Sequence, residues 1–307
     1  MSRPIIFFGT SSFAVPLLNT LAHDARFSIT LVVTQPDRPV GRKQIITPTA
    51  VKTAALVLGL PVFQPEKMKS DEALATLQSY TFDAAVVASY GQILPQRILD
   101  LAPNRFVNLH GSILPAYRGA SPIAEAIKNG DTETGNTVMI MDAGMDHGPT
   151  LATMHVSINS RDTTETLTEK LAQLGAERFC ELFAAYLDGN ITPQEQDHER
   201  ATICKPIKKE QALVNPLTQT AQEIERLTRA YTPWPLTQMV LGGVSLKLIE
   251  VIVQTSSETS SGTFWLEKGA LLLACANNTI LELTQVRPEG GKTMTGAAFF
   301  HGYGSKQ

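Results

Sequence analysis

The sequence is poor in cysteine, with three in 307 residues, at positions 180, 204 and 275. An odd number of widely separated cysteines predicts no disulfide framework, and their spacing matches no metal-binding motif. Cys180 falls in a predicted helix and Cys275 in a predicted strand, where a thiol is usually a small buried hydrophobe. The cysteines therefore favour neither a redox centre nor a metal site, and we expect no metal.

Long hydrophobic runs are also absent. No stretch holds the roughly eighteen apolar residues that span a bilayer, and residues 1–4 lead into a short apolar run without a signal-peptide pattern. No charge dominates either, since the formal net charge is -3. We therefore expect a cytoplasmic, monomeric protein without a membrane partner. Any RNA binding must depend on local basic patches.

A glycine-rich dinucleotide motif is missing as well. Residues 5–8 form an apolar run, helix-compatible residues reach Leu21, and residues 29–33 form a second apolar run. This order is typical of a doubly wound parallel sheet, a Rossmann-like α/β fold. However, residues 9–13 are not Gly-x-Gly-x-x-Gly, and the second strand is not followed by an acidic residue placed for a ribose. The sequence therefore disfavours a nicotinamide cofactor.

The second half of the chain predicts a change of architecture. Residues 162–165 resemble a capping box that opens a helix to Leu187, and residues 190–207 then lose periodicity. Short strands follow from Val244, and their alternation changes phase between Leu248 and Ile249, as at a β-bulge. We therefore expect a small OB-like β-barrel. The expected boundaries are an α/β catalytic domain over residues 1–189, a linker over 190–207 and the barrel domain over 208–307.

Two polar side chains stand at the end of a predicted strand, residues 106–110. Asn108 and His110 are two residues apart, so both leave the strand on the same face. Ligands usually bind at strand ends in open α/β sheets. Asp146 lies in residues 141–148, whose glycines permit a sharp turn back toward this strand. We therefore expect an amide, an imidazole and a carboxylate to meet.

This trio suits acyl transfer without a covalent intermediate. A carboxamide donates a hydrogen bond to a developing oxyanion, and a histidine beside a carboxylate moves a proton or stabilises charge. Each residue taken alone has a simpler interpretation: Asn108 as a turn cap, His110 as a core histidine and Asp146 as a partner for a backbone amide.

Residues 108–122 and 141–148 resemble the folate-dependent formyltransferases, and in particular those members that formylate methionyl-initiator-tRNA. The resemblance implies 10-formyltetrahydrofolate as co-substrate and Asn108, His110 and Asp146 as catalytic residues. Ile113 stands for the first leucine of the family's Ser-Leu-Leu-Pro loop, and Ala116 replaces a usually basic residue. The folate contacts that the resemblance implies are Ser112, Ile113, Leu114, Pro115, Tyr90, Gly91, Ile93, Leu94 and Asp142.

Basic residues gather at two places outside this motif. Arg38, Arg42 and Lys43 lie in a predicted loop, and Lys205, Lys208 and Lys209 cluster at the end of the expected linker. Taken alone, each group is a solvated charge run. The resemblance implies that the loop enters the tRNA acceptor end, with Arg42 leading it, and a basic strip near the linker is suited to phosphates.

Two other functions remain open at this point. A formyltransferase that acts on a nucleotide-linked amino sugar shares the trio, but the basic stretch 38–52 argues against it. An RNA-binding protein with an inactive site is the other alternative, and the intact trio argues against that.

Overall fold

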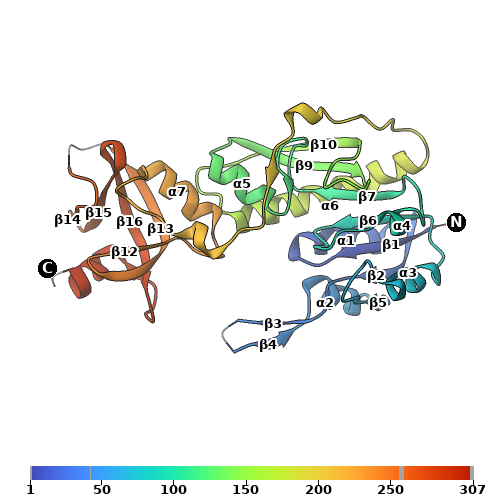
Figure 1. Cartoon of the computed structure of the whole chain (residues 1–307), viewed down its shortest axis with the longest axis horizontal. Helices are drawn as coiled ribbons and strands as arrows, with labels where there is room; N and C mark the ends of the chain where they lie inside the picture. Colours follow the sequence, from blue (N-terminus) through green and yellow to red (C-terminus); the bar gives the residue numbers. More distant parts are fainter. Residues whose placement is uncertain (1, 42, 256–258, 305–307) are drawn as a thin grey trace. The chain divides into compact units, whose positions relative to one another are not determined.

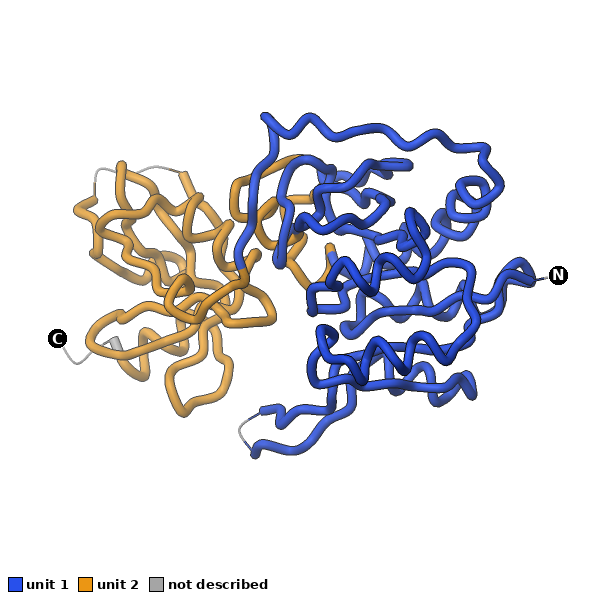
Figure 2. Tube along the Cα trace, turned by 45° about the vertical axis from the view of Figure 1, so that its right-hand side comes forward, with its two compact units in different colours: residues 1–122, 133–157, 168–205 blue, residues 123–132, 158–167, 206–307 orange. Residues whose placement is uncertain are grey.

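The structure is a computed structural model that describes residues 2–41, 43–255 and 259–304. The chain divides into two compact units, coloured separately in Figure 2. Unit 1 comprises residues 1–122, 133–157 and 168–205, and unit 2 comprises residues 123–132, 158–167 and 206–307. Within the described ranges, no helix is long and apolar enough to cross a membrane, and no three His, Cys, Asp or Glu residues are grouped to hold a metal ion.

A seven-stranded sheet forms the centre of unit 1, in the order β10-β9-β7-β6-β1-β2-β5 (Figure 1). The strands from β7 to β5 are parallel, whereas β9 and β10 pair antiparallel at the other edge. The Rossmann-like prediction is confirmed, and the antiparallel edge is an addition that the sequence did not indicate. The strands are β1 (Arg3–Gly9), β2 (Phe27–Val33), β5 (Val62–Phe63), β6 (Ala84–Ala88), β7 (Phe106–His110), β9 (Glu133–Ile140) and β10 (Thr150–Ser157).

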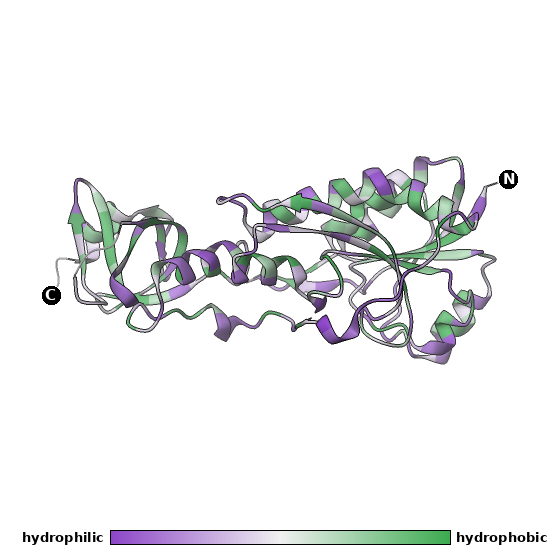
Figure 3. Cartoon of the chain, turned by 90° about the horizontal axis from the view of Figure 1, so that it is seen from above, coloured by the Kyte–Doolittle hydropathy of each residue, from purple (hydrophilic) through white to green (hydrophobic). Residues whose placement is uncertain are grey.

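Helices cover both faces of this sheet. Helices α3 (Asp71–Gln78) and α4 (Gln96–Leu99) contribute to one apolar cluster, together with Phe8 of β1 and Phe106 of β7. On the other face, Phe183 of α6 (Thr164–Leu187) stacks on Phe27 of β2 with ring centroids 5.2 Å apart. Figure 3 shows the sheet mostly in hydrophobic green, whereas the helices carry both colours, as expected of amphipathic helices. The remaining helices of the first hundred residues are α1 (Val15–His23) and α2 (Ala50–Val57).

The start of α6 corrects a prediction. The reciprocal threonine contacts join Thr163 and Thr166: the Thr163 amide donates to Thr166 Oγ1 at 3.0 Å, and the Thr166 amide donates to Thr163 Oγ1 at 3.3 Å. The carboxylate of Asp162 instead accepts from the Asn159 amide at 2.7 Å. The expected capping box at 162–165 was therefore wrong by one residue, because Asp162 is engaged with the preceding turn.

A second correction concerns the predicted basic loop. Residues there form a two-stranded hairpin, β3 (Arg38–Val40) paired with β4 (Ile45–Thr47). Both strands are exposed throughout, so neither shows the apolar alternation that marks a half-buried strand. Arg42 lies outside the described residues.

Unit 2 contains a six-stranded antiparallel sheet, which confirms the predicted change of architecture. The β13 register shifts between Leu248 and Glu250, where the sequence alternation changes phase, and this confirms the predicted bulge. The elements are α7 (Ala221–Ala230), β12 (Gln238–Leu241), β13 (Val244–Gln254), β14 (Phe264–Glu267), β15 (Ala270–Cys275), β16 (Thr279–Pro288), β17 (Met294–Thr295) and α8 (Gly296–Phe299), with α5 (Pro122–Asn129) contributing from residue 123.

Residues 194–205, which we call the clamp segment, belong to unit 1 although the sequence favours a linker there. The backbone of Gln194 bridges to Thr150 of β10, and β11 (Ile203–Cys204) pairs in parallel with β8 (Arg118–Gly119). In Figure 1 the segment is the yellow stretch that runs along the β10 side of the sheet. Its backbone is therefore part of the first unit.

Candidate active site

Strand β7 carries Asn108 and His110, which are 7% and 6% exposed. Strand alternation places both side chains on the face of Phe106, and Val107 and Leu109 on the opposite face. Helix α6 packs closely against that opposite face, since a Cβ at Gly175 would lie 2.5 Å from Leu109 Cδ2. Packing against α6 therefore fixes the apolar face of β7, and Asn108 and His110 lie on its other face, at the candidate site.

The carboxamide of Asn108 is available for a ligand. Within the described residues, no protein group forms a hydrogen bond with it, and neither of its polar atoms is sealed from solvent. Buried amides are usually hydrogen-bonded, so a carboxamide left open at a strand end is a candidate donor to a bound molecule.

His110 is held by two partners. Its Nε2 lies 2.9 Å from the carbonyl oxygen of Tyr117, and its Nδ1 lies 3.6 Å from Oδ2 of Asp146. A carbonyl oxygen only accepts, so Nε2 must carry a hydrogen in this arrangement. The opposite ring nitrogen, Nδ1, is consequently the one that faces the Asp146 carboxylate.

Asp146 is brought to His110 by a strained loop. Its backbone φ is +48°, in the left-handed region that a non-glycine residue seldom adopts. Its Oδ2 accepts a hydrogen bond from the Gly119 amide at 2.8 Å, and its side chain is 16% exposed. The structure thus brings Asp146 to His110, which shares its face of β7 with Asn108, and Asp146 is also bonded to a backbone amide.

The expected folate loop, residues 112–115, is fixed from beneath by a residue that the sequence did not single out. Thr137 of β9 is fully buried, and its hydroxyl donates to the Ser112 carbonyl at 2.7 Å and accepts from the Leu114 amide at 3.0 Å. The Ser112 hydroxyl donates to the Ala116 carbonyl at 2.6 Å. Leu114 is 8% exposed, while Ile113 and Pro115 are half-buried. The loop therefore offers a rigid edge whose serine hydroxyl hydrogen is already used.

The loop that follows β6 divides its residues between the core and the surface. The Tyr90 ring is buried edge-on to Phe8, its hydroxyl contacts the Met68 sulfur at 3.3 Å, and burial raises its pKa. Its carbonyl oxygen accepts from Thr10 Oγ1 at 2.7 Å. Leu94 is buried as well, whereas Ile93 is 83% exposed.

Gly91 has a φ of +85°, and a Cβ there would lie 3.3 Å from Gln35 Nε2. This turn therefore favours glycine. The loop presents backbone and aliphatic groups to a ligand, and the Tyr90 phenol is not among them.

Asp142 is engaged within its own loop. Its Oδ1 accepts from the Gly144 amide at 2.9 Å, and its Oδ2 lies 2.7 Å from Nδ1 of His147. The His147 ring stacks on His198 of the clamp segment, with centroids 4.1 Å apart. Asp142 therefore contacts this loop and is not joined to the trio by a hydrogen bond.

Two further residues that the sequence did not single out are Arg118 and Gln196, each 7% exposed. The Gln196 oxygen accepts from the guanidinium of Arg118, and its nitrogen donates to carbonyl oxygens of the Asp146 loop. Arg118 stands within the motif that carries the resemblance, but no periodicity distinguishes Gln196.

The expected tRNA-binding residues differ in their partners. Arg38 pairs with Glu66 at 2.6 Å. Lys43, Lys205, Lys208 and Lys209 are exposed and, within the described part of the chain, have no carboxylate partner. Lys52, in the same basic stretch, is paired with Asp37 at 2.6 Å, and this contact lowers the pKa of the Asp37 carboxyl. These four lysines are therefore more available to bind phosphate than Arg38 and Lys52, which are paired with carboxylates.

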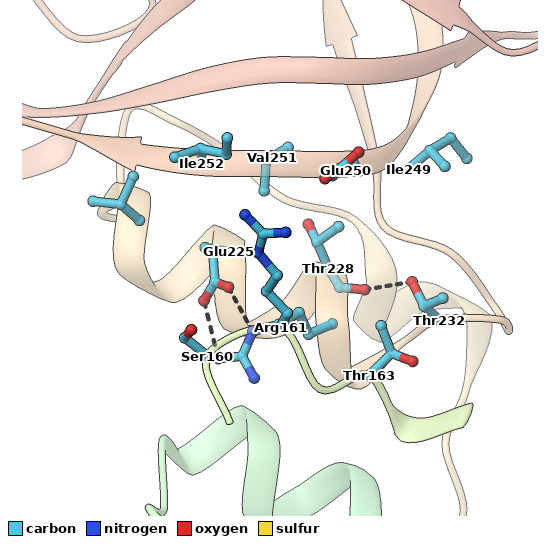
Figure 4. Close-up of a pocket in the computed structure, with 12 residues that line it drawn as sticks. Ser160, Arg161, Thr163, Glu225, Thr228, Thr232, Ile249, Glu250, Val251 and Ile252 are labelled. Carbon is cyan, nitrogen blue, oxygen red and sulfur yellow. Dashed lines mark hydrogen bonds and ion pairs between the residues drawn. The ribbon is translucent and has the colours of Figure 1, made fainter. Parts of the chain in front are cut away.

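Unit 2 contains a cavity of about 410 Å³ between residues 160–163, α7 and β13 (Figure 4). Glu225 and Arg229 form an ion pair at its wall, and Arg229 also donates to the Asp162 carbonyl at 3.0 Å. None of the expected site residues lines this cavity. The cavity is therefore not lined by Asn108, His110 or Asp146, and we assign it no part in the reaction.

The chain is similar to known proteins over nearly its whole length. Residues 3–182 match the formyl transferase family, and residues 206–304 match the formyl transferase C-terminal domain. A protein named methionyl-tRNA formyltransferase from Roseiflexus sp. (strain RS-1) is 42% identical over 304 residues, which cover 98% of this chain and 93% of that protein. One of the same name from Listeria innocua is 38% identical over 301 residues, covering 98% and 96%.

Among solved structures, WlaRD, a sugar 3N-formyl transferase crystallised in the presence of dTDP and 5-N-formyl-THF, superposes with a TM-score of 0.69. The identity is 18%, over 92% of this chain and 97% of that one, so this likeness shows a shared fold. The two family matches together span most of the chain, and the sequence relatives cover nearly all of it. This chain therefore belongs to the formyl transferase family, within its methionyl-tRNA formyltransferase group.

Proposed function

We propose that this protein transfers the formyl group of 10-formyltetrahydrofolate to the free α-amine of methionyl-initiator-tRNA. The observation that carries the proposal is the open carboxamide of Asn108 beside His110, whose Nδ1 faces Asp146 at 3.6 Å. This arrangement offers hydrogen-bond donors for an oxyanion and an acid-base pair next to it. The relatives named methionyl-tRNA formyltransferase support the choice of substrate.

In the proposed mechanism the uncharged amine attacks the formyl carbon of the folate. The carbonyl oxygen becomes an oxyanion, which accepts hydrogen bonds from the Asn108 carboxamide and the protonated Nδ1 of His110. Asp146 orients the His110 ring, whose Nδ1 lies 3.6 Å from Oδ2 of the carboxylate. No bond forms between the enzyme and the formyl group.

The proton balance then involves Asp146. The attacking amine loses one proton, directly or through water, to the Asp146 carboxylate. Asp146 then passes that proton to N10 of the folate as the bond between N10 and the formyl carbon breaks, so the carboxylate is regenerated. The products are N-formylmethionyl-tRNA and tetrahydrofolate. The reaction consumes no redox equivalent, and the proposal assigns no metal to it.

For the folate, we propose contacts with Ser112, Ile113, Leu114 and Pro115 on one side and with the Tyr90 to Leu94 loop on the other. Exposed Ile93 offers aliphatic surface, and Gly91 allows close approach of the backbone. The assignment of Tyr90 is limited to its backbone, because its ring is buried in the core. Asp142 would act through the loop that it closes.

For the tRNA, we propose that Arg38, Arg42 and Lys43 contact the acceptor end and that Lys205, Lys208 and Lys209 contact phosphates. Exposed lysines without carboxylate partners are suited to phosphate contacts, which weaken with salt. We assign catalysis to residues 1–189, to whose unit the clamp segment also belongs, and tRNA binding largely to residues 208–307. Because the proposed acceptor is a translation substrate, we expect the protein to act in the cytoplasm, as a monomer.

The test is formyl transfer from 10-formyltetrahydrofolate to aminoacylated initiator tRNA, with aminoacylated elongator tRNA and a nucleotide-linked amino sugar as parallel acceptors. We expect selective formylation of the initiator. Transfer to the sugar but to neither tRNA would refute the proposal and assign the chain to sugar formylation. Salt-sensitive tRNA binding without any transfer would indicate an inactive RNA-binding relative.

A further inference from the structure

Gln196 uses its whole carboxamide in four hydrogen bonds. Its Oε1 accepts from Nε and Nη2 of Arg118, at 3.1 and 2.7 Å. Its Nε2 donates to the carbonyl oxygens of Asp146 and Gly148, at 3.0 and 2.7 Å. A glutamine amide has two donor hydrogens and two acceptor lone pairs, so each is matched here.

These contacts join the two segments that place the Asp146 carboxylate. On one side, Gln196 Nε2 donates to the backbone carbonyl of Asp146. On the other side, Arg118 precedes Gly119, whose amide donates to Asp146 Oδ2, and the Arg118 amide donates to the Thr202 carbonyl at 2.9 Å. One side chain therefore links the loop that carries Asp146 to the strand that contacts its carboxylate.

The loop needs such support because of its backbone. Asp146 has a φ of +48°, and a Cβ at Gly148 would lie 2.1 Å from the Ile140 carbonyl oxygen. Residues held in sparsely populated backbone regions persist only when surrounding contacts determine them. The two hydrogen bonds that Gln196 donates go to Asp146 and Gly148, the same two residues whose backbone is constrained.

We propose that Gln196 is a positioning residue, which sets the distance between Asp146 and His110 by fixing the 142–148 loop. The inference rests on the proposed function, because the positioned pair is the proposed acid-base pair. Gln196 does not touch His110 and acts only through the loop backbone and Arg118. The clamp segment thus belongs to the active site, because its Gln196 supports the loop that carries Asp146.

The alternative is that Gln196 only fastens the clamp segment to Arg118. Gln196→Glu separates the two roles, since a carboxylate of nearly the same shape still accepts from the guanidinium but has no hydrogen to donate. Gln196→Leu removes both contacts. Gln194→Leu is the matched control. Gln194 lies two residues upstream in the same segment and is exposed, and among the described residues its side chain donates only to the nearby Thr192 carbonyl.

Two measurements on the full-length variants distinguish the roles. Hydrogen exchange of peptides covering residues 141–149 reports the loop directly and needs no substrate. Steady-state kinetics report kcat and KM for 10-formyltetrahydrofolate. We expect Gln196→Glu to speed loop exchange and to lower kcat by about tenfold to a hundredfold, since small misplacements of catalytic groups have effects of this size. We expect its KM to stay within about threefold of the wild type.

Faster loop exchange and reduced kcat in both Gln196 variants, with Gln194→Leu like the wild type, would support the inference. Wild-type exchange and kcat in Gln196→Glu would overturn it, because the fastening role alone would then suffice. Equal effects in Gln194→Leu would overturn it too, by showing that any change in the segment matters. A wild-type protein that transfers no formyl group would refute the proposed function, and the exchange comparison would still decide whether Gln196 holds the loop.

Discussion

Thr137→Val is the sharpest test of how the candidate folate loop is held. The two side chains have nearly the same shape, but valine lacks the hydroxyl that accepts from the Leu114 amide and donates to the Ser112 carbonyl. Thr137 is fully buried, so in the variant neither the Leu114 amide nor the Ser112 carbonyl can bond to water instead unless the loop moves. The substitution therefore isolates two hydrogen bonds from packing.

The magnitude follows from those two bonds. Each lost partner leaves a buried polar group unsatisfied at about 1–3 kcal/mol, and the added methyl returns about 0.8 kcal/mol. We expect the free energy of unfolding of unit 1 to fall by about 1–5 kcal/mol. For a unit of this size, that lowers its Tm by about 2–20 °C. We also expect a raised KM for 10-formyltetrahydrofolate, because Ser112 to Pro115 would be less well ordered before binding.

The chain supplies its own control for this assay. Both tryptophans, Trp234 and Trp265, lie in unit 2, so intrinsic tryptophan fluorescence follows that unit. Circular dichroism follows mainly unit 1, which holds most of the long helix α6. Thr137→Val should move the dichroism transition and leave the fluorescence transition in place. Thr153→Val is the matched variant, because Thr153 pairs with Thr137 across the sheet but is exposed. A shift below about 0.5 kcal/mol in Thr137→Val, or equal shifts in both variants, would refute this reasoning.

Three further outcomes are expected. Asn108→Ala should lower kcat by about a hundredfold to a thousandfold, because it removes a donor to the oxyanion. Its Tm should change little, because the Asn108 carboxamide has no hydrogen-bond partner among the described residues. Near-normal turnover would remove Asn108 from the mechanism. Gly135→Ala should destabilise the protein by about 2–3 kcal/mol, since the Cβ would lie 1.9 Å from the Met154 carbonyl oxygen, whereas Gly302→Ala meets nothing within 4 Å and should be neutral in thermal unfolding. Burial raises the pKa of Cys180 from 9.0 to about 12 and that of Cys275 to about 11.

The raised pKa values of the two thiols lower the stability of the fold at high pH. Below pH 9 both thiols are neutral in either state; above it the unfolded chain loses protons that the folded chain keeps, so the free energy of unfolding falls. The slope is up to about 1.4 kcal/mol per pH unit for each thiol. Denaturation between pH 8 and 11 should therefore be less steep with pH in a Cys180→Ala, Cys275→Ala variant, and an unchanged slope would contradict the assignment.

Local patterns predicted much of the fold. A capping box of Thr220 and Glu223 starts α7, and the predicted phase change after Leu248 marks a bulge. In both cases the signal and its partner lie within a few residues of each other. Prediction was wrong where exposure removed the signal, as in the β3–β4 hairpin, and at the α6 cap, where two neighbouring residues could each cap the helix.

The candidate site was predictable only in part, for a related reason. Asn108 and His110 share a face through strand geometry alone, and Asp146 follows a glycine-rich bend. The positions of Thr137 and Gln196 depend on backbone carbonyls and amides, which leave no trace in side-chain periodicity. The buried ring of Tyr90 could not be read from its loop either, because a tyrosine suits both a core and a pocket.

The β8–β11 pairing also has a consequence for the order in which the chain folds. All seven strands of the unit 1 sheet have been synthesised by residue 157, whereas Arg118 meets Gln196 across a separation of 78 residues. Contacts of such separation form late, because loop closure must precede them. A nascent chain can therefore complete its sheet while the Asp146 bend is still unsupported, and chemical competence is acquired only as the last residues of unit 1 leave the ribosome.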